Sequence, residues 1–293
     1  MDGIINVRKE KGFTSFDVVA KLRGILKMKK IGHTGTLDPD AEGVLPVCIG
    51  KATRVCDLLT DKDKVYEAVM LLGKETDTQD MTGTILKESE VNFSIEEVKQ
   101  CIESFVGEYA QIPPMYSALK VNGKKLYELA REGKTVERKP RPVHFYEIEI
   151  LDISFPLVRF RVTCSKGTYI RTLCHDIGEK LGCGAAMESL LRTKVGRFTL
   201  DDAITLAQTE EAVQKGIIES KILGIEEILA EYPRVCCTKE GDRLLANGNP
   251  LVQALVDAQE KNGWIRMCSS EGSFAGVYQW DEKRNRYFPV KMF

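Results

Sequence analysis

The chain has 293 residues, of which 43% are hydrophobic and 29% charged, which excludes a wholly disordered protein. Its 42 basic and 43 acidic residues give a net charge of −1, so the totals alone do not indicate a nucleic-acid-binding protein. No apolar run approaches the roughly 18 residues of a membrane helix, and the N-terminus lacks a secretory pattern. We expect a cytosolic protein with one large domain, or a large and a small one.

Charge is unevenly distributed along the chain. Residues 18–37 carry five bases and no acid, and residues 118–142 carry eight bases and three acids. Residues 61–103 carry five bases and eleven acids. This segregation could build a basic face on a nearly neutral protein. Solvated helix faces give the same pattern, however, and charge alone favours them.

The nine cysteines are scattered and include no CxxC pair, which indicates reduced thiols that lie mostly in the core. There are three histidines, and none lies at a ligand spacing from two cysteines. The nearest approach is Cys174-His175 with Cys183, which fits a helix and the turn after it. We therefore expect no metal site.

Periodicity and capping residues predict the elements in chain order. Thr14 and Asp17 have the spacing of a capping box, as do Ser94 and Glu97. Apolar residues then recur at helical spacing, whereas alternation and short apolar runs indicate strands. The predicted order is a strand at 3–7, a helix at 15–28, a loop at 32–43, strands at 44–49 and 65–72, a helix from 94, an antiparallel pair at 143–155 and 157–164, a helix at 170–181, a helical stretch at 201–231, a boundary at 232–233, and a small unit with a strand at 235–237, a helix ending at 247–248 and strands at 264–268, 274–280 and 287–292.

The loop at 32–43 is the most informative segment. It combines His33 with the carboxylates of Asp38, Asp40 and Glu42 among three glycines, which let a backbone approach a ligand closely. An aspartate before a proline is also common in ordinary turns. From chemistry alone the loop fits an active site and a structural turn about equally well.

Two further segments carry groups suited to a site. Residues 165–172 join a strand to a helix, and Arg171 opens that helix against the helix dipole, which predicts an acidic partner. Residues 111–120 contain two prolines that force an extended course, followed by a tyrosine and a lysine. Taken singly, an ordinary salt bridge and a rigid connector explain these two segments best.

Seven motif runs follow one another along the chain: Gly32-His33-Thr34-Gly35-Thr36-Leu37-Asp38-Pro39, Ala41-x-Gly43-x-Leu45-Pro46, Lys64-x-Tyr66, Thr76-Asp77-Thr78-x-Asp80-x-x-Gly83, Gln111-x-Pro113-Pro114-x-Tyr116-Ser117-Ala118-x-Lys120, Gly167-Thr168-Tyr169-Ile170-Arg171 and Leu190-Leu191-Arg192-Thr193-x-Val195-Gly196. Taken together and in this order, they resemble the motifs of the TruB-type tRNA pseudouridine synthases. The resemblance is strong over residues 3–200 and weak over 201–293.

The sequence departs from the family pattern at two places. Lys9-Glu10 stands where the family often has Lys-Pro, and we expect this change to affect a loop near the N-terminus and not the chemistry. Thr193 stands where a second arginine is common, which we expect to weaken one RNA contact.

The resemblance implies an α+β pseudouridine synthase fold, with a large mixed, mainly antiparallel β-sheet flanked by helices and a small β-rich PUA-like domain at the C-terminus. We expect a catalytic domain over 1–231 and an RNA-binding domain over 232–293. The implied reaction converts uridine-55 in the T-loop of tRNA to pseudouridine: the base is flipped out, its glycosidic bond breaks and a C–C bond forms. This isomerisation involves no redox change, so no cofactor is expected. The implied partner is the T-arm of tRNA, and we expect a monomer.

The resemblance also implies roles for individual residues. Asp38 is the catalytic carboxylate, either as a nucleophile or in forming a glycal, and Arg171 is its partner. Tyr66 stacks on the uracil and can move a proton. His33 fills the stack that the flipped base vacates, which offsets part of the flipping cost of a few kcal/mol. The other expected substrate-binding residues are the pocket walls Tyr169 and Leu190, together with Lys64, Asp80 and Lys120.

Two other functions are weaker alternatives. A glycoside hydrolase could use Asp38 with Asp40 or Glu42, since paired carboxylates flank a sugar C1 in those enzymes. Two tryptophans are few for a sugar cleft, however, and a neutral glycan does not need the basic segments. A non-catalytic RNA-binding protein would bind tRNA unchanged when Asp38 is altered and would leave no modified base.

Overall fold

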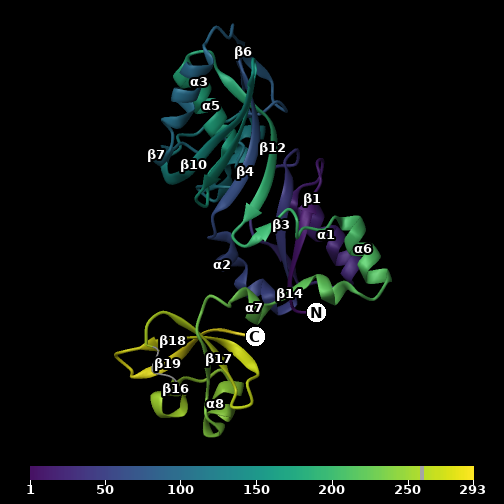
Figure 1. Cartoon of the computed structure of the whole chain (residues 1–293), viewed down its shortest axis with the longest axis vertical. Helices are drawn as coiled ribbons and strands as arrows, with labels where there is room; N and C mark the ends of the chain where they lie inside the picture. The colour runs from purple at the N-terminus through teal and green to yellow at the C-terminus, as the bar shows by residue number, and fades with distance from the viewer. Residues whose placement is uncertain (258–260) are drawn as a thin grey trace.

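The computed structural model describes residues 1–257 and 261–293. A ten-stranded sheet with flanking helices occupies most of the chain, and a five-stranded sheet forms a separate body at one end (Figure 1). The predicted α+β fold, with a large mixed sheet and a small β-rich C-terminal part, is confirmed. Among the described residues, no helix is long and apolar enough to cross a membrane.

The large sheet is antiparallel except at its centre. There β12 runs parallel to β3, with Leu191 opposite Glu42, and every other neighbouring pair along the sheet is antiparallel. The strands in spatial order are β14 (Ile222–Gly224), β1 (Gly3–Lys9), β3 (Glu42–Ile49), β12 (Ala185–Val195), β4 (Lys64–Leu72), β11 (Leu157–Cys164), β10 (Arg141–Ser154) and β7 (Gly107–Gln111), with β2 (Ile31–His33) beside β3 and β13 (Phe198–Thr199) beside β12.

The helices begin where the capping residues predict. Thr14 and Ser94 accept hydrogen bonds from the third helical residue in complete capping boxes, and Gly182 ends a helix at a φ of +83°. The helices are α1 (Ser15–Leu26), α2 (Cys56–Thr60), α3 (Ile95–Glu103), α4 (Leu126–Arg131), α5 (Ile170–Leu181), α6 (Leu206–Gln214), α7 (Ile225–Ile228), α8 (Asp242–Ala246) and the 3-10 turns η1 (Gly50–Val55), η2 (Ile218–Lys221), η3 (Lys239–Gly241) and η4 (Gln253–Leu255). Two short hairpins pair β5 (Lys74–Thr76) with β6 (Ile85–Glu88) and β8 (Lys120–Val121) with β9 (Lys124–Lys125).

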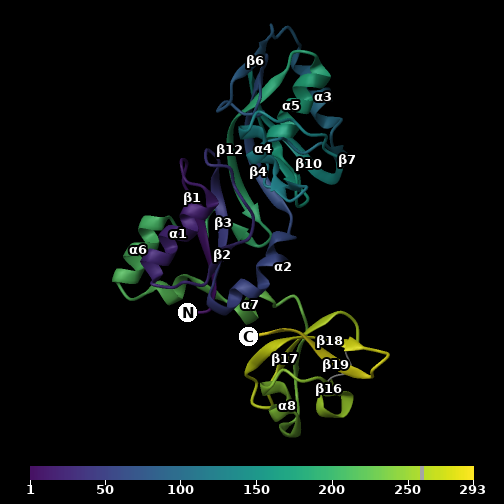
Figure 2. The same ribbon diagram turned by 180° about the vertical axis from the view of Figure 1, so that it is seen from behind.

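Two apolar cores lie on either side of the β3–β12 contact. Helices α1 and α6 cover β1 and β3, while α3 and α5 lie against β4, β10 and β11, and both views show this separation (Figures 1 and 2). The loop between β2 and β3 crosses from the first core to the second, because its Leu37 and Ala41 are buried in the second. The loop is therefore anchored where the two halves of the sheet meet.

The stretch 201–231 is less helical than predicted. Residues 222–224 form β14, which pairs with β1 from Gly3 to Ile5. An uncovered edge strand exposes unpaired backbone groups, and β14 covers the edge that β1 would otherwise present. Local composition favoured a helix there, but this distant pairing partner decides the structure.

The C-terminal sheet has the order β15 (Arg234–Cys236), β17 (Trp264–Cys268), β18 (Phe274–Asp281), β19 (Arg286–Met292) and β16 (Leu251–Val252). It has its own apolar core, and Val277 on β18 joins a second cluster with Val55 and Ile225 of the larger body. Lys291 also forms an ion pair with Asp57 at 2.7 Å. The two bodies therefore share an apolar and ionic contact.

Candidate active site

Asp38 lies on the loop between β2 and β3, and the loop is fixed by contacts on both sides of it. The Leu37 backbone N–H donates to the Ser15 hydroxyl at 2.9 Å, and Leu37 itself is 3% exposed. The Ala41 N–H donates to the Asp38 carbonyl at 3.1 Å, which closes a turn around Pro39. The carboxylate is therefore presented from a fixed backbone.

Lys9 holds the same loop by hydrogen bonds to its backbone. It is fully buried on β1, and its ammonium donates to the carbonyl oxygens of Pro39 at 3.0 Å and Ala41 at 2.5 Å, and to Glu10 at 3.0 Å. Burial lowers the pKa of Lys9 to about 8. Two of the three carbonyls that Lys9 binds belong to residues just after Asp38, so the N-terminal segment supports the loop that carries this carboxylate. The expectation that the change at Lys9-Glu10 leaves the chemistry unaffected stays a prediction.

Arg192 on β12 holds the other end of the loop. It is 1% exposed, and its guanidinium donates to the Val44 carbonyl at 2.7 Å and the Gly35 carbonyl at 3.3 Å. Gly43 has a φ of +110°, and a Cβ there would lie 2.1 Å from the Arg192 carbonyl oxygen. Only glycine allows β12 to approach this closely.

Arg171 connects three segments at the Asp38 carboxylate. It lies in the first turn of α5 and is 6% exposed. Its Nη2 lies 3.3 Å from an Asp38 oxygen and donates to the Tyr116 carbonyl at 2.6 Å, and its Nη1 lies 3.6 Å from Asp80. The prediction that this arginine has an acidic partner is confirmed, and it has two.

The electrostatics of Asp38 are set by opposing influences. Burial raises the pKa of its carboxyl, and Arg171 opposes this increase, while Asp80 adds to it. The side chain remains 36% exposed, so one face of the carboxylate is open. A buried arginine beside a partly desolvated carboxylate favours the ionised form, which a nucleophile or base requires.

A cleft of about 850 Å³ opens in front of this carboxylate. Tyr66 on β4 is 8% exposed, and burial raises the pKa of its phenol. Gln111 fixes Tyr169 through two backbone hydrogen bonds of 2.9 and 3.0 Å, and the Arg171 guanidinium lies 5.9 Å from the Tyr169 ring centre. The cleft is of a size that suits a small planar group. Of the sequence-predicted residues, those that line it are Asp38, Lys64, Tyr66, Tyr169, Arg171 and Leu190.

Lys64 lies deep in the cleft wall. It is 6% exposed, its ammonium donates to the carbonyls of Thr60 and Lys62, and burial lowers its pKa to about 8. These bonds tie the end of α2 to β4.

Three predicted residues do not line the cleft. Asp80 lies behind Arg171 and is held by Thr78 and Thr82, so its contact with the site passes through the guanidinium. His33 is half-buried on β2, where its Nδ1 accepts from the Gly35 N–H at 3.4 Å. Lys120 is exposed on β8, next to cleft residues 118–119.

The sequence does not predict three residues that hold the site together: Lys9, Arg192 and Gln111. Arg192 and Gln111 belong to the motif runs, and Lys9 lies where the sequence departs from the family pattern. A lysine or arginine on a strand is ordinarily solvent-facing. The available signal was their place beside the glycine-rich loop motif, but their burial depends on distant carbonyl groups.

Comparison with known proteins gives a consistent result. Residues 23–170 match the TruB family pseudouridylate synthase (N terminal domain), and residues 171–230 match the tRNA pseudouridylate synthase B C-terminal domain. The chain belongs to the TruB family. A "tRNA pseudouridine synthase B" from Lachnoclostridium phytofermentans is 56% identical over the full length of both chains. The predicted family and enzyme class, an isomerase, are confirmed.

Two solved structures similar to this TruB-family chain each cover 99% of it. A chain of a Cbf5-Nop10-Gar1 complex is 29% identical, with a TM-score of 0.75 over 84% of that chain. A chain of an H/ACA RNP bound to a substrate RNA containing 2′-deoxyuridine is 27% identical, with a TM-score of 0.73 over 84% of that chain. Both matched family segments end by residue 230, so neither extends into the C-terminal sheet.

Proposed function

We propose that the protein isomerises uridine-55 in the T-loop of tRNA to pseudouridine. The observation that carries this proposal is the geometry around Asp38, a carboxylate held by a buried arginine at 3.3 Å and open on one side to a cleft walled by Tyr66 and Tyr169. The name of the full-length relative, a tRNA pseudouridine synthase, supports the substrate class.

The chemistry follows from the position of these groups. The flipped uridine enters the cleft, and the bond between uracil N1 and ribose C1′ breaks. The ring turns over, C5 bonds to C1′, the C5 proton leaves to solvent and N1 takes up a proton. Asp38 either attacks C1′ and leaves again when C5 bonds to C1′, or removes the C2′ proton to give a glycal and returns that proton to C2′ when C5 bonds to C1′. Both routes require the carboxylate ionised. Tyr66 supports the ring and can exchange a proton with it. No electron acceptor is needed, so no cofactor is proposed.

RNA contacts outside the cleft complete the proposal. The basic segments 18–37 and 118–142, including Lys120, contact phosphates, and His33 stacks in the gap that the uridine leaves. Residues 232–293 act as a supporting RNA-binding domain beside a catalytic domain over 1–231, and the enzyme works as a monomer in the cytosol. The related solved chain in a complex with substrate RNA supports an RNA partner for this fold.

The test replaces Asp38 with asparagine and maps pseudouridine in an unmodified tRNA transcript. We expect no modified base at position 55, with tRNA binding retained, because the substitution removes the charge and the nucleophile but keeps the shape. Asp40→Asn is the matched control, since Asp40 lies on the same loop and is exposed. Modification by Asp38→Asn within about tenfold of wild type, a barrier change of only about 1.4 kcal/mol, would exclude Asp38 as the reacting group. Release of free base or sugar would instead favour a hydrolase.

A further inference from the structure

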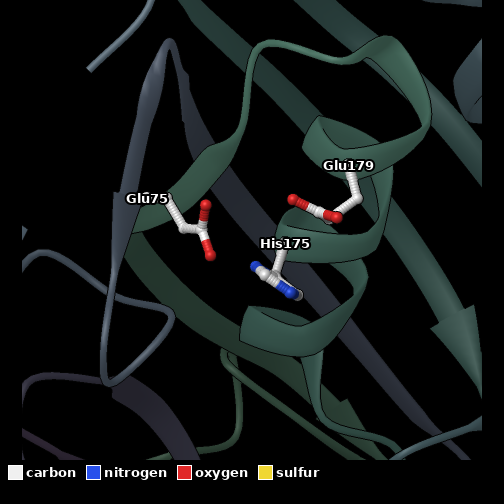
Figure 3. A group of neighbouring side chains, drawn as sticks. All are labelled: Glu75, His175 and Glu179. Carbon is white, nitrogen blue, oxygen red and sulfur yellow. The ribbon is translucent and has the colours of Figure 1, made fainter. Parts of the chain in front are cut away.

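A second cluster of reactive side chains lies outside the cleft, between α5 and β5. It consists of Glu75 on β5 and of His175 and Glu179, which are four residues apart on α5. One ligand atom from each lies within 4.8 Å of the other two. Figure 3 shows the three side chains pointing toward one another across the gap between strand and helix. None of them lines the 850 Å³ cleft.

Among the described residues, the two carboxylates of the cluster have no positively charged partner. Within residues 1–257 and 261–293, neither Glu75 nor Glu179 has a lysine or arginine within ion-pair distance. Glu179 also lies in the last turn of α5, where the helix dipole disfavours a negative charge. Two carboxylates converging without a cation repel each other, so the arrangement lacks a positive group.

The histidine supplies an independent observation. The Nδ1 atom of His175 is buried and has no hydrogen-bond partner among the residues that the structure describes. A buried polar atom without a partner costs roughly 1–3 kcal/mol, so such atoms ordinarily have a ligand, a water or a protein group beside them. A metal ion bound through Nδ1 satisfies both the histidine and the carboxylates.

We propose that Glu75, His175 and Glu179 bind a divalent transition-metal ion of the zinc class. An imidazole nitrogen with two carboxylate oxygens suits zinc and its neighbours, whereas magnesium and calcium prefer oxygen ligands alone. Donor atoms around a tetrahedral ion lie roughly 3.3 Å apart. The exposed Glu179 side chain can close the remaining distance, and water takes the fourth position.

The ion ties helix α5 to the β5–β6 hairpin. Arg171 opens this helix one turn before His175, and β5 leads directly into the turn that carries Asp80. Thr172 already joins the two elements through Gln79 at 2.8 Å. The ion therefore acts as a clamp on the elements that position the Arg171–Asp80 contact, and it takes no part in the reaction itself.

The test uses the full chain, freed of metal with a chelator and titrated with Co²⁺ and Zn²⁺. We expect one Zn²⁺ per chain by calorimetry and a Co²⁺ absorption spectrum without thiolate charge-transfer bands, which separates this site from the nine cysteines. Glu179→Gln and His175→Gln should each weaken binding at least tenfold. Glu188→Gln, an exposed carboxylate on β12, should leave binding unchanged.

Three results would overturn the proposal. They are the absence of stoichiometric binding, binding that persists in Glu179→Gln, and a Co²⁺ spectrum dominated by thiolate bands. Glu179 is exposed, so its substitution should not disturb folding even if His175→Gln does. Thermal unfolding with and without Zn²⁺ gives a second readout: Zn²⁺ should raise the midpoint in wild type and in Glu188→Gln but not in Glu179→Gln.

Discussion

Replacing Arg171 with lysine should impair catalysis far more than a loss of charge would. The guanidinium contacts Asp38 and the Tyr116 carbonyl through Nη2, at 3.3 and 2.6 Å, and Asp80 through Nη1 at 3.6 Å. A single ammonium cannot reproduce a planar fork that spans three segments. A hydrogen bond to a charged group contributes about 1.5–3 kcal/mol, so loss of the Asp38 contact alone should lower kcat/KM by roughly 10- to 150-fold.

The assay is a single-turnover release of tritium from C5-labelled uridine in a tRNA transcript. Circular dichroism and tRNA binding should be close to wild type, so the defect lies in the chemical step. Arg161→Lys is the matched control, because Arg161 contacts Glu67 and Glu149 outside the cleft and is 42% exposed. A rate for Arg171→Lys within threefold of wild type across the pH range would show that Arg171 supplies only a general positive charge.

The other predictions concern acid inactivation, the loop anchors and salt. Burial raises the pKa of Asp38, and activity needs the ionised carboxylate. Activity should therefore decline on acidification at a pH above the ordinary aspartate pKa of about 3.9. A kcat profile that is flat down to that pH would contradict this. Lys9→Met should lower the free energy of unfolding in urea by about 2–4 kcal/mol, because buried carbonyl groups lose their hydrogen-bond donor. The same substitution at the exposed Lys11 should lower it little. Equal losses in the two variants would refute the anchoring role of Lys9. Gly43→Ala should prevent stable folding, because the added Cβ would meet the Arg192 backbone. Gly24 on α1 has open space around it, so Gly24→Ala should leave the thermal unfolding midpoint unchanged or raise it. Affinity for tRNA should fall steeply with salt, by somewhat less than about one log–log unit per phosphate contact, and a flat response would identify the basic segments as solvated faces.

Local elements of this fold can be predicted from the sequence because their causes are local. The capping boxes at Thr14 and Ser94 and the left-handed glycine at 182 each depend on residues within one helical turn. The alternation of apolar and polar residues likewise predicts β10 and β11. Their antiparallel pairing follows because the short connection between them leaves few other partners. The parallel contact between β3 and β12 has no such local signal.

The candidate site is predictable to a similar extent. The carboxylate and its arginine follow from the family motifs, and the structure brings Asp38 and Arg171 together although they are 133 residues apart. The buried states of Lys9 and Arg192 cannot be derived from pattern, because the carbonyl groups that stabilise them lie 32 and 148 residues away. His33 and Lys120 belong to the motif segments, but the cleft is formed without them.

The β3–β12 contact also affects when the enzyme becomes active during its own synthesis. Arg192 closes the loop that carries Asp38 by binding Val44, 148 residues earlier in the chain. At ribosomal speeds of about 5–20 residues per second, the loop exists for roughly 7–30 s before its closing strand is made. A nascent chain therefore carries Asp38 without the strand and arginine that fix its loop. With Asp38 in its proposed role, the chain should not modify RNA beside the ribosome until about two-thirds of it has been translated.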